Sequence, residues 1–224
     1  MTPEKTMEAT KKSAGQVAPV IEAYRKIHTN LAQLLESGDK RSVVFIGAES
    51  GAGASTLSAN LAIVIAQTGA RVLVMDADMR APAQCRNFKV PDSAGLSAIL
   101  AGLATPDDCI HKQVKPNVDL LPSGSTPSNP SEMLCSSRMR ALLEEVSNRY
   151  DYVFIDCPSL CVATDALTIA RHTAGVVLTA RYNRTTCRKY AKTMKQIEAA
   201  RITLLGAVIC DQQERERKFG FLGK

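Results

Sequence analysis

Short apolar runs recur along the chain and alternate with segments of helical periodicity. The run at 42–46 (SVVFI) is continuous, as expected of a strand that is buried on both faces of a parallel sheet. Similar runs follow at 72–75, 118–121, 153–155, 175–180 and 204–209. Apolar residues at three- and four-residue steps indicate helices between them, most clearly at 55–68, 137–148 and 186–200. The alternation predicts an α/β fold with a doubly wound, mostly parallel sheet, helices on both faces and ligands beyond the carboxyl ends of the strands.

The segment before the first strand predicts a helix that carries apolar residues on one side. The helical spacing involves Val20, Ile21, Tyr24, Ile27 and Leu31, and Gly38 is expected to end the helix. Residues 1–18 lack such spacing. We therefore expect a flexible segment at 1–18, a single domain at 19–210 that includes the first helix, and a flexible tail at 211–224. The pattern between 80 and 117 is less regular, with a short helix expected at 95–103.

Composition narrows the choice of partners. A chain of 224 residues that is 45% hydrophobic can bury one sizeable core. Aromatic residues make up 4% and tryptophan is absent, which speaks against aromatic platforms for single-stranded nucleic acid. The net charge of +6 is spread along the chain among acids, so we expect no nucleic-acid partner, although an anionic membrane surface could attract the protein.

Cysteine usage and hydropathy bear on location. The seven cysteines are odd in number and form no metal-ligand spacing, which favours a reducing cytosol. The apolar runs are shorter than the ~20 residues of a membrane span, and residues 1–15 are polar. We expect neither a membrane span nor a secretion signal.

A glycine-rich segment at 47–56 (GAESGAGAST) follows the first predicted strand and leads into a helix. Backbone N–H groups at such a position can bind phosphate, and the candidates here are Gly51, Ala52, Gly53, Ala54, Ser55 and Thr56. A Walker A loop ends in Gly-Lys-Ser/Thr, but Ala54 replaces the lysine, and the early glycine is Gly47 instead of residue 48. Taken alone, the segment is either a nucleotide loop or a glycine turn that starts a helix.

Three aspartates follow two other predicted strands. Asp76 and Asp78 come after 72–75, and Asp156 comes after 153–155. Parallel strands end at one edge of a sheet, so these carboxylates would lie where a magnesium-bound nucleotide would sit. Buried unpaired carboxylates are costly, which favours a metal ion or another cation among them. The alternative is that each aspartate caps a solvated turn.

Three segments resemble those of bacterial tyrosine kinases. Residues 76–82 (DADMRAP) are similar to the second Walker motif of that family, 150–158 (YDYVFIDCP) to its Walker B strand, and 124–134 (GSTPSNPSEML) to a stretch typical of capsule-type members. The resemblance runs from about residue 21 to 209. It implies a P-loop NTPase of the deviant Walker type, related to MinD and ParA, that acts as an ATP-dependent protein-tyrosine autokinase with Mg²⁺ and regulates capsular or exopolysaccharide synthesis and export.

The resemblance also implies roles for single residues. Ser55 would bind magnesium directly, with Asp78 and Asp156 holding the ion through waters. Asp76 would be the general base for an acceptor tyrosine hydroxyl, and Arg80 would neutralise nearby charge unless it simply pairs with Asp78. Cys210 stands where the family ends its last strand with an asparagine that reads adenine.

Assembly is implied by the first helix. Family members form rings, octamers by resemblance, through a Glu-x-x-Arg-x-x-Arg stripe, and Glu22, Arg25 and His28 occupy these steps. His28 replaces an arginine, which predicts a weaker or pH-sensitive ring unless the stripe is a plain solvated helix face. The family further implies a membrane adaptor that recruits and activates the cytoplasmic kinase.

The chain departs from the family at three places that matter for activity. Ala54 replaces the Walker lysine, Cys210 replaces the asparagine, and no tyrosine follows Tyr190, although the family's tail carries several. These departures predict lost or weakened phosphoryl transfer, in either a mutated kinase or a natural pseudokinase scaffold. A MinD- or ParA-like switch ATPase is disfavoured because Glu49 stands where those proteins carry an additional lysine.

Overall fold

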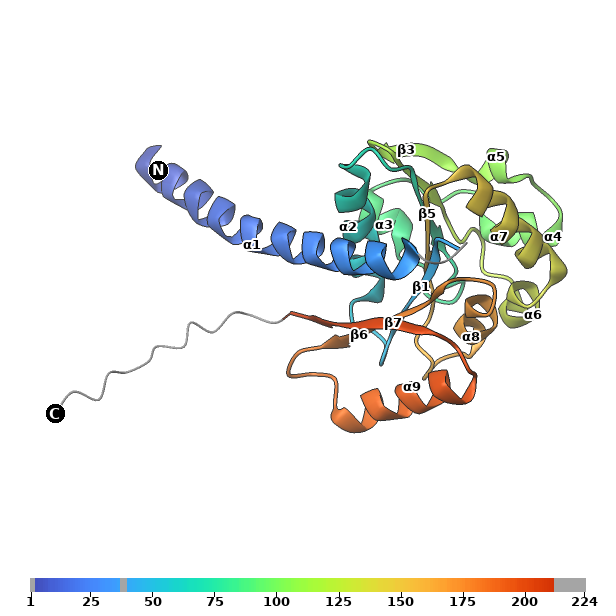
Figure 1. Ribbon diagram of the computed structural model, residues 1–224. Helices are drawn as coiled ribbons and strands as arrows, with labels where there is room; N and C mark the ends of the chain where they lie inside the picture. Colours follow the sequence, from blue (N-terminus) through green and yellow to red (C-terminus); the bar gives the residue numbers. More distant parts are fainter. Residues whose placement is uncertain (1–2, 37–39, 212–224) are drawn as a thin grey trace.

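The computed structural model describes residues 3–36 and 40–211, and for residues 3–19 only the helical backbone. Seven strands in this part of the chain form one sheet in the order β3-β4-β2-β5-β1-β6-β7. Their bounds are β1 (Ser42–Gly47), β2 (Val72–Asp76), β3 (His111–Lys115), β4 (Val118–Leu121), β5 (Tyr152–Asp156), β6 (Gly175–Arg181) and β7 (Leu204–Cys210). All neighbouring strands are parallel except β3 and β4, which pair antiparallel (Figure 1).

Helices cover both faces of the sheet, as the sequence predicted. The long helix is α1 (Pro3–Glu36), and the three helices of intermediate length are α2 (Ala54–Ala66), α7 (Ser137–Arg149) and α9 (Cys187–Ala199). The short ones are α3 (Gln84–Phe88), α4 (Leu96–Ala101), α5 (Pro106–Cys109), α6 (Pro130–Leu134) and α8 (Asp165–Ala170).

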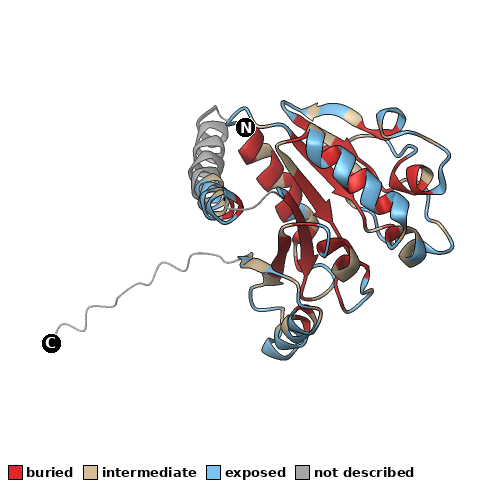
Figure 2. Cartoon of the chain, turned by 45° about the vertical axis from the view of Figure 1, so that its right-hand side comes forward, coloured by how far each residue is buried: buried red, intermediate tan, exposed pale blue. Residues whose placement is uncertain are grey.

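The two faces of the sheet form two hydrophobic cores because successive side chains of a strand point in opposite directions. In β1, Val43 and Phe45 pack with α1, α2 and α3, whereas Val44 and Ile46 pack with α4 and with α6 to α9. Figure 2 shows the buried strands at the centre with exposed helix surfaces outside. Every residue of β1 and β2 is buried, which explains the continuous apolar runs in their sequences.

The pattern missed two features. β3 has the mostly polar sequence HKQVK and lies at the sheet edge, half-buried or exposed, so it has no apolar run to reveal it. The spacing from Val20 onward predicted the first helix but did not predict the helical backbone of residues 3–18. The expected break at Gly38, and the tail from residue 212 onward, lie outside the described residues, and the expected division into flexible ends and one domain stays a prediction.

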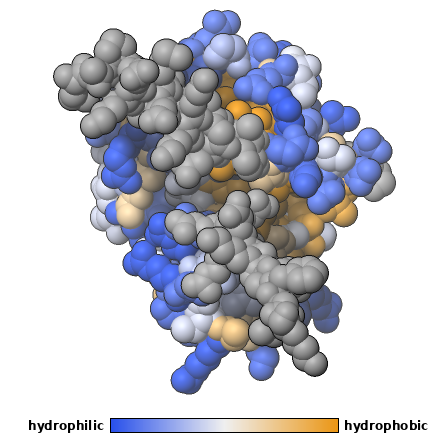
Figure 3. All heavy atoms as spheres, turned by 90° about the vertical axis from the view of Figure 1, so that its left-hand side faces the viewer, coloured by the Kyte–Doolittle hydropathy of each residue, from blue (hydrophilic) through white to orange (hydrophobic). Residues whose placement is uncertain are grey.

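The surface is mostly hydrophilic on the side from which α1 projects, with a smaller gathering of hydrophobic side chains (Figure 3). Among the described residues, large apolar side chains exposed by half or more include Val20 and Leu34 of α1 and Ile209 of β7. None of the described helices is both long and apolar enough to cross a membrane.

Candidate nucleotide site

The glycine-rich loop joins β1 to α2 and is tied to the neighbouring strands. The Ala48 N–H donates to the carbonyl oxygen of Thr179 in β6 at 2.8 Å, and the Ala52 N–H closes a turn onto the Glu49 carbonyl at 3.2 Å. A Cβ on Gly47 would lie 2.5 Å from that same Glu49 carbonyl oxygen. The loop therefore needs glycine at 47, one residue before the position of the strict Walker pattern.

The loop presents backbone donors at the start of α2. Gly53 is the N-cap, with φ of 99°, a conformation that glycine adopts readily. The N–H groups of Ala54, Ser55 and Thr56 in the first turn have no intrahelical acceptor, and the positive end of the helix dipole lies with them. Ala54 is buried and ends in a methyl group. The loop thus keeps the backbone chemistry of a phosphate site but brings no cation at the Walker lysine position.

The strand-end acids meet beneath this loop, as the sequence predicted. Asp76 of β2 and Asp156 of β5 are paired in register, and each is 1% exposed. Burial raises the pKa of Asp76 to about 6. Burial, followed by the charge of Asp76, raises the pKa of Asp156 to about 8. Two carboxyls therefore share a buried position in which full ionisation is unfavourable without a cation.

Asp76 also shapes the loop that follows it. Its Oδ2 accepts from the N–H groups of Ala83 and Gln84, both at 2.9 Å, and its Oδ1 accepts from the Asp78 N–H at 3.2 Å. These bonds hold the segment after β2 against the sheet. The carboxylate of Asp76 is consequently closed off from solvent by its own loop.

Gln84 is a site residue that the sequence reasoning missed. It is fully buried, and its Nε2 lies 2.7 Å from Asp156 Oδ2, 3.1 Å from the Ser55 carbonyl oxygen and 3.2 Å from Ser58 Oγ. One side chain thereby links the start of α2 to the acid at the end of β5. A glutamine two residues after Pro82, close behind the acidic motif, was the only signal available in the sequence.

The remaining oxygen of Asp156 suits a metal ion. Asp156 Oδ1 is buried and has no hydrogen-bond partner in the described part of the chain, and the Ser55 hydroxyl lies close enough to lower the Asp156 pKa. Serine and carboxylate oxygens fit Mg²⁺, which retains waters and phosphate oxygens instead of a full protein cage. The described residues contain no group of three or more His, Cys, Asp or Glu side chains placed to hold a metal.

Asp78 and Arg80 lie at the rim of the site. Asp78 is half-buried, and its Oδ1 accepts from the N–H groups of Arg80 and Ala81 at 3.2 and 3.0 Å. The Arg80 guanidinium points elsewhere: Nη1 lies 3.0 Å from Asp165 Oδ2, and Nη2 lies 2.9 Å from Ser131 Oγ. The side-chain ion pair is therefore with Asp165, which is 4% exposed, and not with Asp78.

Cys210 lies beside the loop at the end of β7. Its Sγ would be 3.0 Å from a Cβ built on Gly53, and burial raises the pKa of the thiol. The position expected for base recognition is thus adjacent to the phosphate loop.

Of the three residues in the α1 stripe, two are exposed to solvent and one packs against the domain. Glu22 and Arg25 are exposed and form an ion pair of 3.8 Å with each other. His28 turns toward the sheet, with its ring edge-on to Tyr152 at 6.3 Å between centroids, and burial lowers its pKa. The assembly role of these three residues stays a prediction.

Two sizeable cavities lie away from the acids. One of about 590 Å³ lies between β6, β7 and α9, and one of about 610 Å³ lies along α7 beside Lys40 and His172. Neither is lined by Asp76, Asp78 or Asp156. The site is recognised by its loop, its acids and its unpartnered oxygen instead of by cavity size.

The fold and the site define a P-loop α/β nucleoside-triphosphatase domain. Accordingly, residues 40–204 match the model of an AAA domain family. A putative tyrosine-protein kinase, CapB of Staphylococcus aureus, is 33% identical over 190 residues, which cover 85% of this chain and 83% of CapB. The chain belongs to the bacterial tyrosine-protein kinase family.

Further matches include a longer relative and solved structures. The putative tyrosine-protein kinase EpsB of Ralstonia solanacearum is 34% identical over 91% of this chain, but the chain spans only 27% of EpsB. The kinase domain of the Escherichia coli tyrosine kinase ETK superposes with a TM-score of 0.80 at 32% identity, covering 87% of this chain and 78% of that one. The Mg-ADP complex of MinD from Pyrococcus horikoshii, at 22% identity and a TM-score of 0.64 over 75% of this chain and 69% of MinD, shows the shared fold alone.

Proposed function

We propose that this chain is an ATP-dependent protein-tyrosine kinase domain of the capsule and exopolysaccharide type, in which Ala54 has weakened or abolished phosphoryl transfer. The observation that carries the proposal is the buried pair Asp76 and Asp156 beneath the glycine loop, with Asp156 Oδ1 unpartnered in the described residues. Such a pair is costly without a cation and is suited to a magnesium-bound nucleotide.

The residues take the following roles. Backbone N–H groups of 51–56 bind the phosphates, and Ser55, Asp78 and Asp156 hold Mg²⁺, which neutralises phosphate charge when bound. Asp76 accepts the proton of an acceptor tyrosine, for which its raised pKa is suitable. Because its carboxylate is 1% exposed, the segment 77–83 must open before a tyrosine hydroxyl can reach it. Gln84 positions Asp156 relative to α2.

Ala54 explains why transfer should be weak. A Walker lysine reaches the β and γ phosphates, and a charged group in such a position stabilises the transition state. Loss of one preorganised donor in a catalytic site typically costs roughly 100- to 1,000-fold in rate. A test of transfer needs a supplied acceptor peptide, because no tyrosine follows Tyr190 in the 224 residues.

Family membership suggests how the kinase assembles and is recruited to the membrane. We infer a cytoplasmic protein that forms a ring through Glu22, Arg25 and His28 and is recruited to the membrane by a separate adaptor. The exposure of Glu22 and Arg25 supports the first part of this inference. The lowered pKa of His28 leaves it neutral near pH 7, so it contributes less to a charged interface than an arginine would.

A non-catalytic scaffold is the second candidate, favoured by Ala54 together with the absence of tail tyrosines. A switch ATPase of the MinD type is less favoured. The Glu49 carboxylate, at the place of the additional lysine in those proteins, pairs with Lys189 of α9 at 2.5 Å. Position 49 therefore offers a partner subunit no lysine of the kind that the MinD-type proteins carry there.

The test restores lysine at position 54. The unmodified chain and Ala54→Lys are incubated with Mg²⁺, γ-labelled ATP and a tyrosine-rich peptide, and phosphotyrosine is measured, with Ala54→Lys/Asp76→Asn as the control. Transfer by the single variant alone supports a disabled tyrosine kinase. If the lysine variant binds Mg·ATP but transfers nothing, the scaffold or switch interpretation takes its place.

A further inference from the structure

The end of β6 and the start of α9 bring cations to the loop that lacks its lysine. Thr179 of β6 is in register with Gly47, so Arg181, two residues further on, is level with the glycine-rich loop. Its Nη1 lies 3.5 Å from the carbonyl oxygen of Gly51. Lys189 reaches the same loop through Glu49. Two cations from neighbouring elements thus contact the glycine-rich loop, at Gly51 and Glu49, in which Ala54 stands in place of the lysine.

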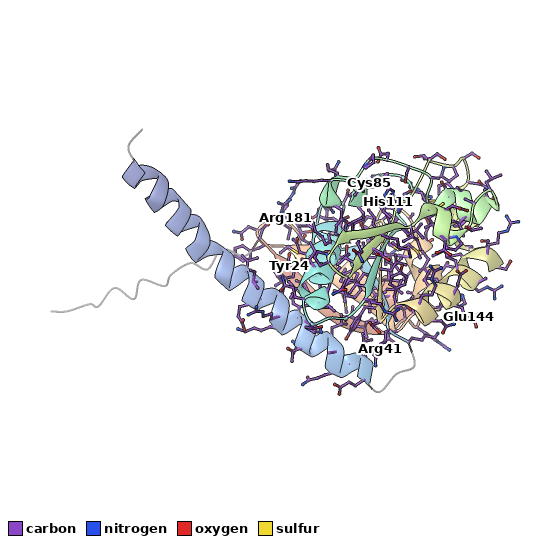
Figure 4. All side chains as sticks on the ribbon, turned by 90° about the horizontal axis from the view of Figure 1, so that it is seen from above. Tyr24, Arg41, Cys85, His111, Glu144 and Arg181 are labelled. Carbon is purple, nitrogen blue, oxygen red and sulfur yellow. The ribbon has the colours of Figure 1, made fainter. Side chains whose placement is uncertain are left out.

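The backbone that carries Arg181 is firmly held. Its N–H donates to Thr185 Oγ1 at 2.9 Å, and the N–H groups of Arg184 and Thr185 return to its carbonyl at 3.2 and 2.9 Å. On the other side, Arg181 is in register with Cys210 of β7, whose thiol abuts Gly53. Figure 4 shows Arg181 on the side of the domain where Tyr24 of α1 lies. The guanidinium is therefore mounted between the loop and the end of β7.

Arg181 keeps hydrogen-bonding capacity for a ligand. Its Nε donates to Asp211 Oδ2 and its Nη1 to Gly51, which together use two of five N–H donors. The side chain is 37% exposed, so solvent and solutes can reach it. Guanidinium donors match phosphate oxygens in geometry and charge.

Lys189 is 52% exposed and reaches the loop only through an acid. Its ammonium lies 2.5 Å from Glu49 Oε2, and the Glu49 side chain is 13% exposed. The Glu49 pKa is lowered chiefly by this bond. Lys189 thus neutralises a carboxylate that would otherwise repel phosphate. Arg181 also pairs with an acid, Asp211, but that carboxylate is 55% exposed, and the Arg181 Nη2 group keeps its donors for a ligand.

We propose that Arg181 binds the phosphates of the nucleotide in place of the missing Walker lysine. This inference rests on the proposed nucleotide site but goes beyond it, because Arg181 comes from another strand and does not belong to the glycine-rich motif. It predicts that the unmodified chain, despite Ala54, still binds a magnesium-bound triphosphate.

The test is equilibrium binding measured by calorimetry with two probes, Mg·ATP and Mg·tripolyphosphate, which has phosphates but no base. Arg181→Met should weaken the binding of both probes by at least about tenfold, the size expected for losing one charge-assisted hydrogen bond. Arg188→Met, an exposed arginine of α9, is the matched control and should stay within about twofold. Arg181→Lys should fall between the two, and an unchanged melting temperature of the free variants excludes misfolding.

The Ala54→Lys background separates replacement from mere proximity. If Arg181 binds the phosphates in place of the lysine, Arg181→Met should reduce the affinity by less than about threefold once a lysine is restored at position 54. Equal cost in both backgrounds would overturn the replacement, as would weakening of Mg·ATP binding without weakening of tripolyphosphate binding. Binding by Ala54→Lys but not by the unmodified chain would also overturn it and leave the proposed kinase intact. Failure of both proteins to bind Mg·ATP would instead refute the proposed function.

Discussion

Replacing Asp156 by asparagine should stabilise the ligand-free protein at pH 8 and should do so much less at pH 5. Burial raises the pKa of Asp76 to about 6 and that of Asp156 to about 8, so the folded state binds protons more tightly than the unfolded chain. The stability that these protons contribute is fully present below about pH 4 and is lost as pH rises through the folded values. The ligand-free protein should therefore lose stability between pH 5 and 8.

The smaller of the two shifts, that of Asp76, gives a lower limit for the loss that Asp156 causes. The Asp76 pKa lies about two pKa units above its usual value of 3.8. At about 1.4 kcal/mol per unit, the loss is on the order of 3 kcal/mol by pH 8. Asp156→Asn removes one of the two charges while keeping an acceptor for Gln84 Nε2. Burial is the main cause of the raised Asp76 pKa, so the Asp76 part of the loss remains in the variant and the Asp156 part disappears.

Urea denaturation at four pH values between 5 and 8, with EDTA present, measures the free energy of unfolding of both proteins. His28 and His172 have pKa values lowered by burial and act in the opposite direction in this window. Both proteins contain both histidines, so the difference between their curves of unfolding free energy against pH gives the contribution of Asp156. Glu198→Gln, an exposed acid of α9, is the control. Parallel curves for the unmodified chain and Asp156→Asn would refute the reasoning.

Three further outcomes follow from single contacts. Gly53→Ala should cost about 1–2 kcal/mol in urea denaturation from backbone strain alone. The new Cβ would also lie 3.0 Å from Cys210 Sγ, which adds a steric cost. If Gly53→Ala costs as much in a Cys210→Ala background, that steric contribution is contradicted. Arg80→Ala should cost about 1–3 kcal/mol because Asp165 is left buried without its cation. Arg80→Ala/Asp165→Asn should recover part of this loss, and an undiminished loss would speak against the pair. Glu22→Ala/Arg25→Ala should shift any ring to smaller species in sedimentation velocity at equal concentration, with Lys26→Ala as the exposed control on α1. An unchanged mass distribution would exclude the stripe.

The sequence predicted the parts of the fold that depend on continuous burial. Central strands such as β1 have every residue buried and so appear as unbroken apolar runs. β3 was missed because it lies at the sheet edge, where polar residues are tolerated. The start of α1 was missed because residues before Val20 show no apolar spacing, although their backbone is helical.

The site could be predicted only as far as strand ends determine it. Asp76 and Asp156 were expected together because parallel strands finish at one edge, and they are paired in register. Gln84 reaches Asp156 across 72 positions, and Arg80 reaches Asp165 across 85. Such partners depend on how the loop after β2 folds back over the sheet. No local spacing rule encodes that path.

The central claim is that the glycine loop and the buried acids form a magnesium-nucleotide site although Ala54 replaces the Walker lysine. The most direct measurement is calorimetric titration of Mg·ATP into the unmodified chain and into Ala54→Lys, each with and without EDTA. We predict magnesium-dependent binding by both proteins at one site per chain, tighter in the lysine variant. If neither protein binds Mg·ATP, or if EDTA leaves the binding unchanged, the account is contradicted.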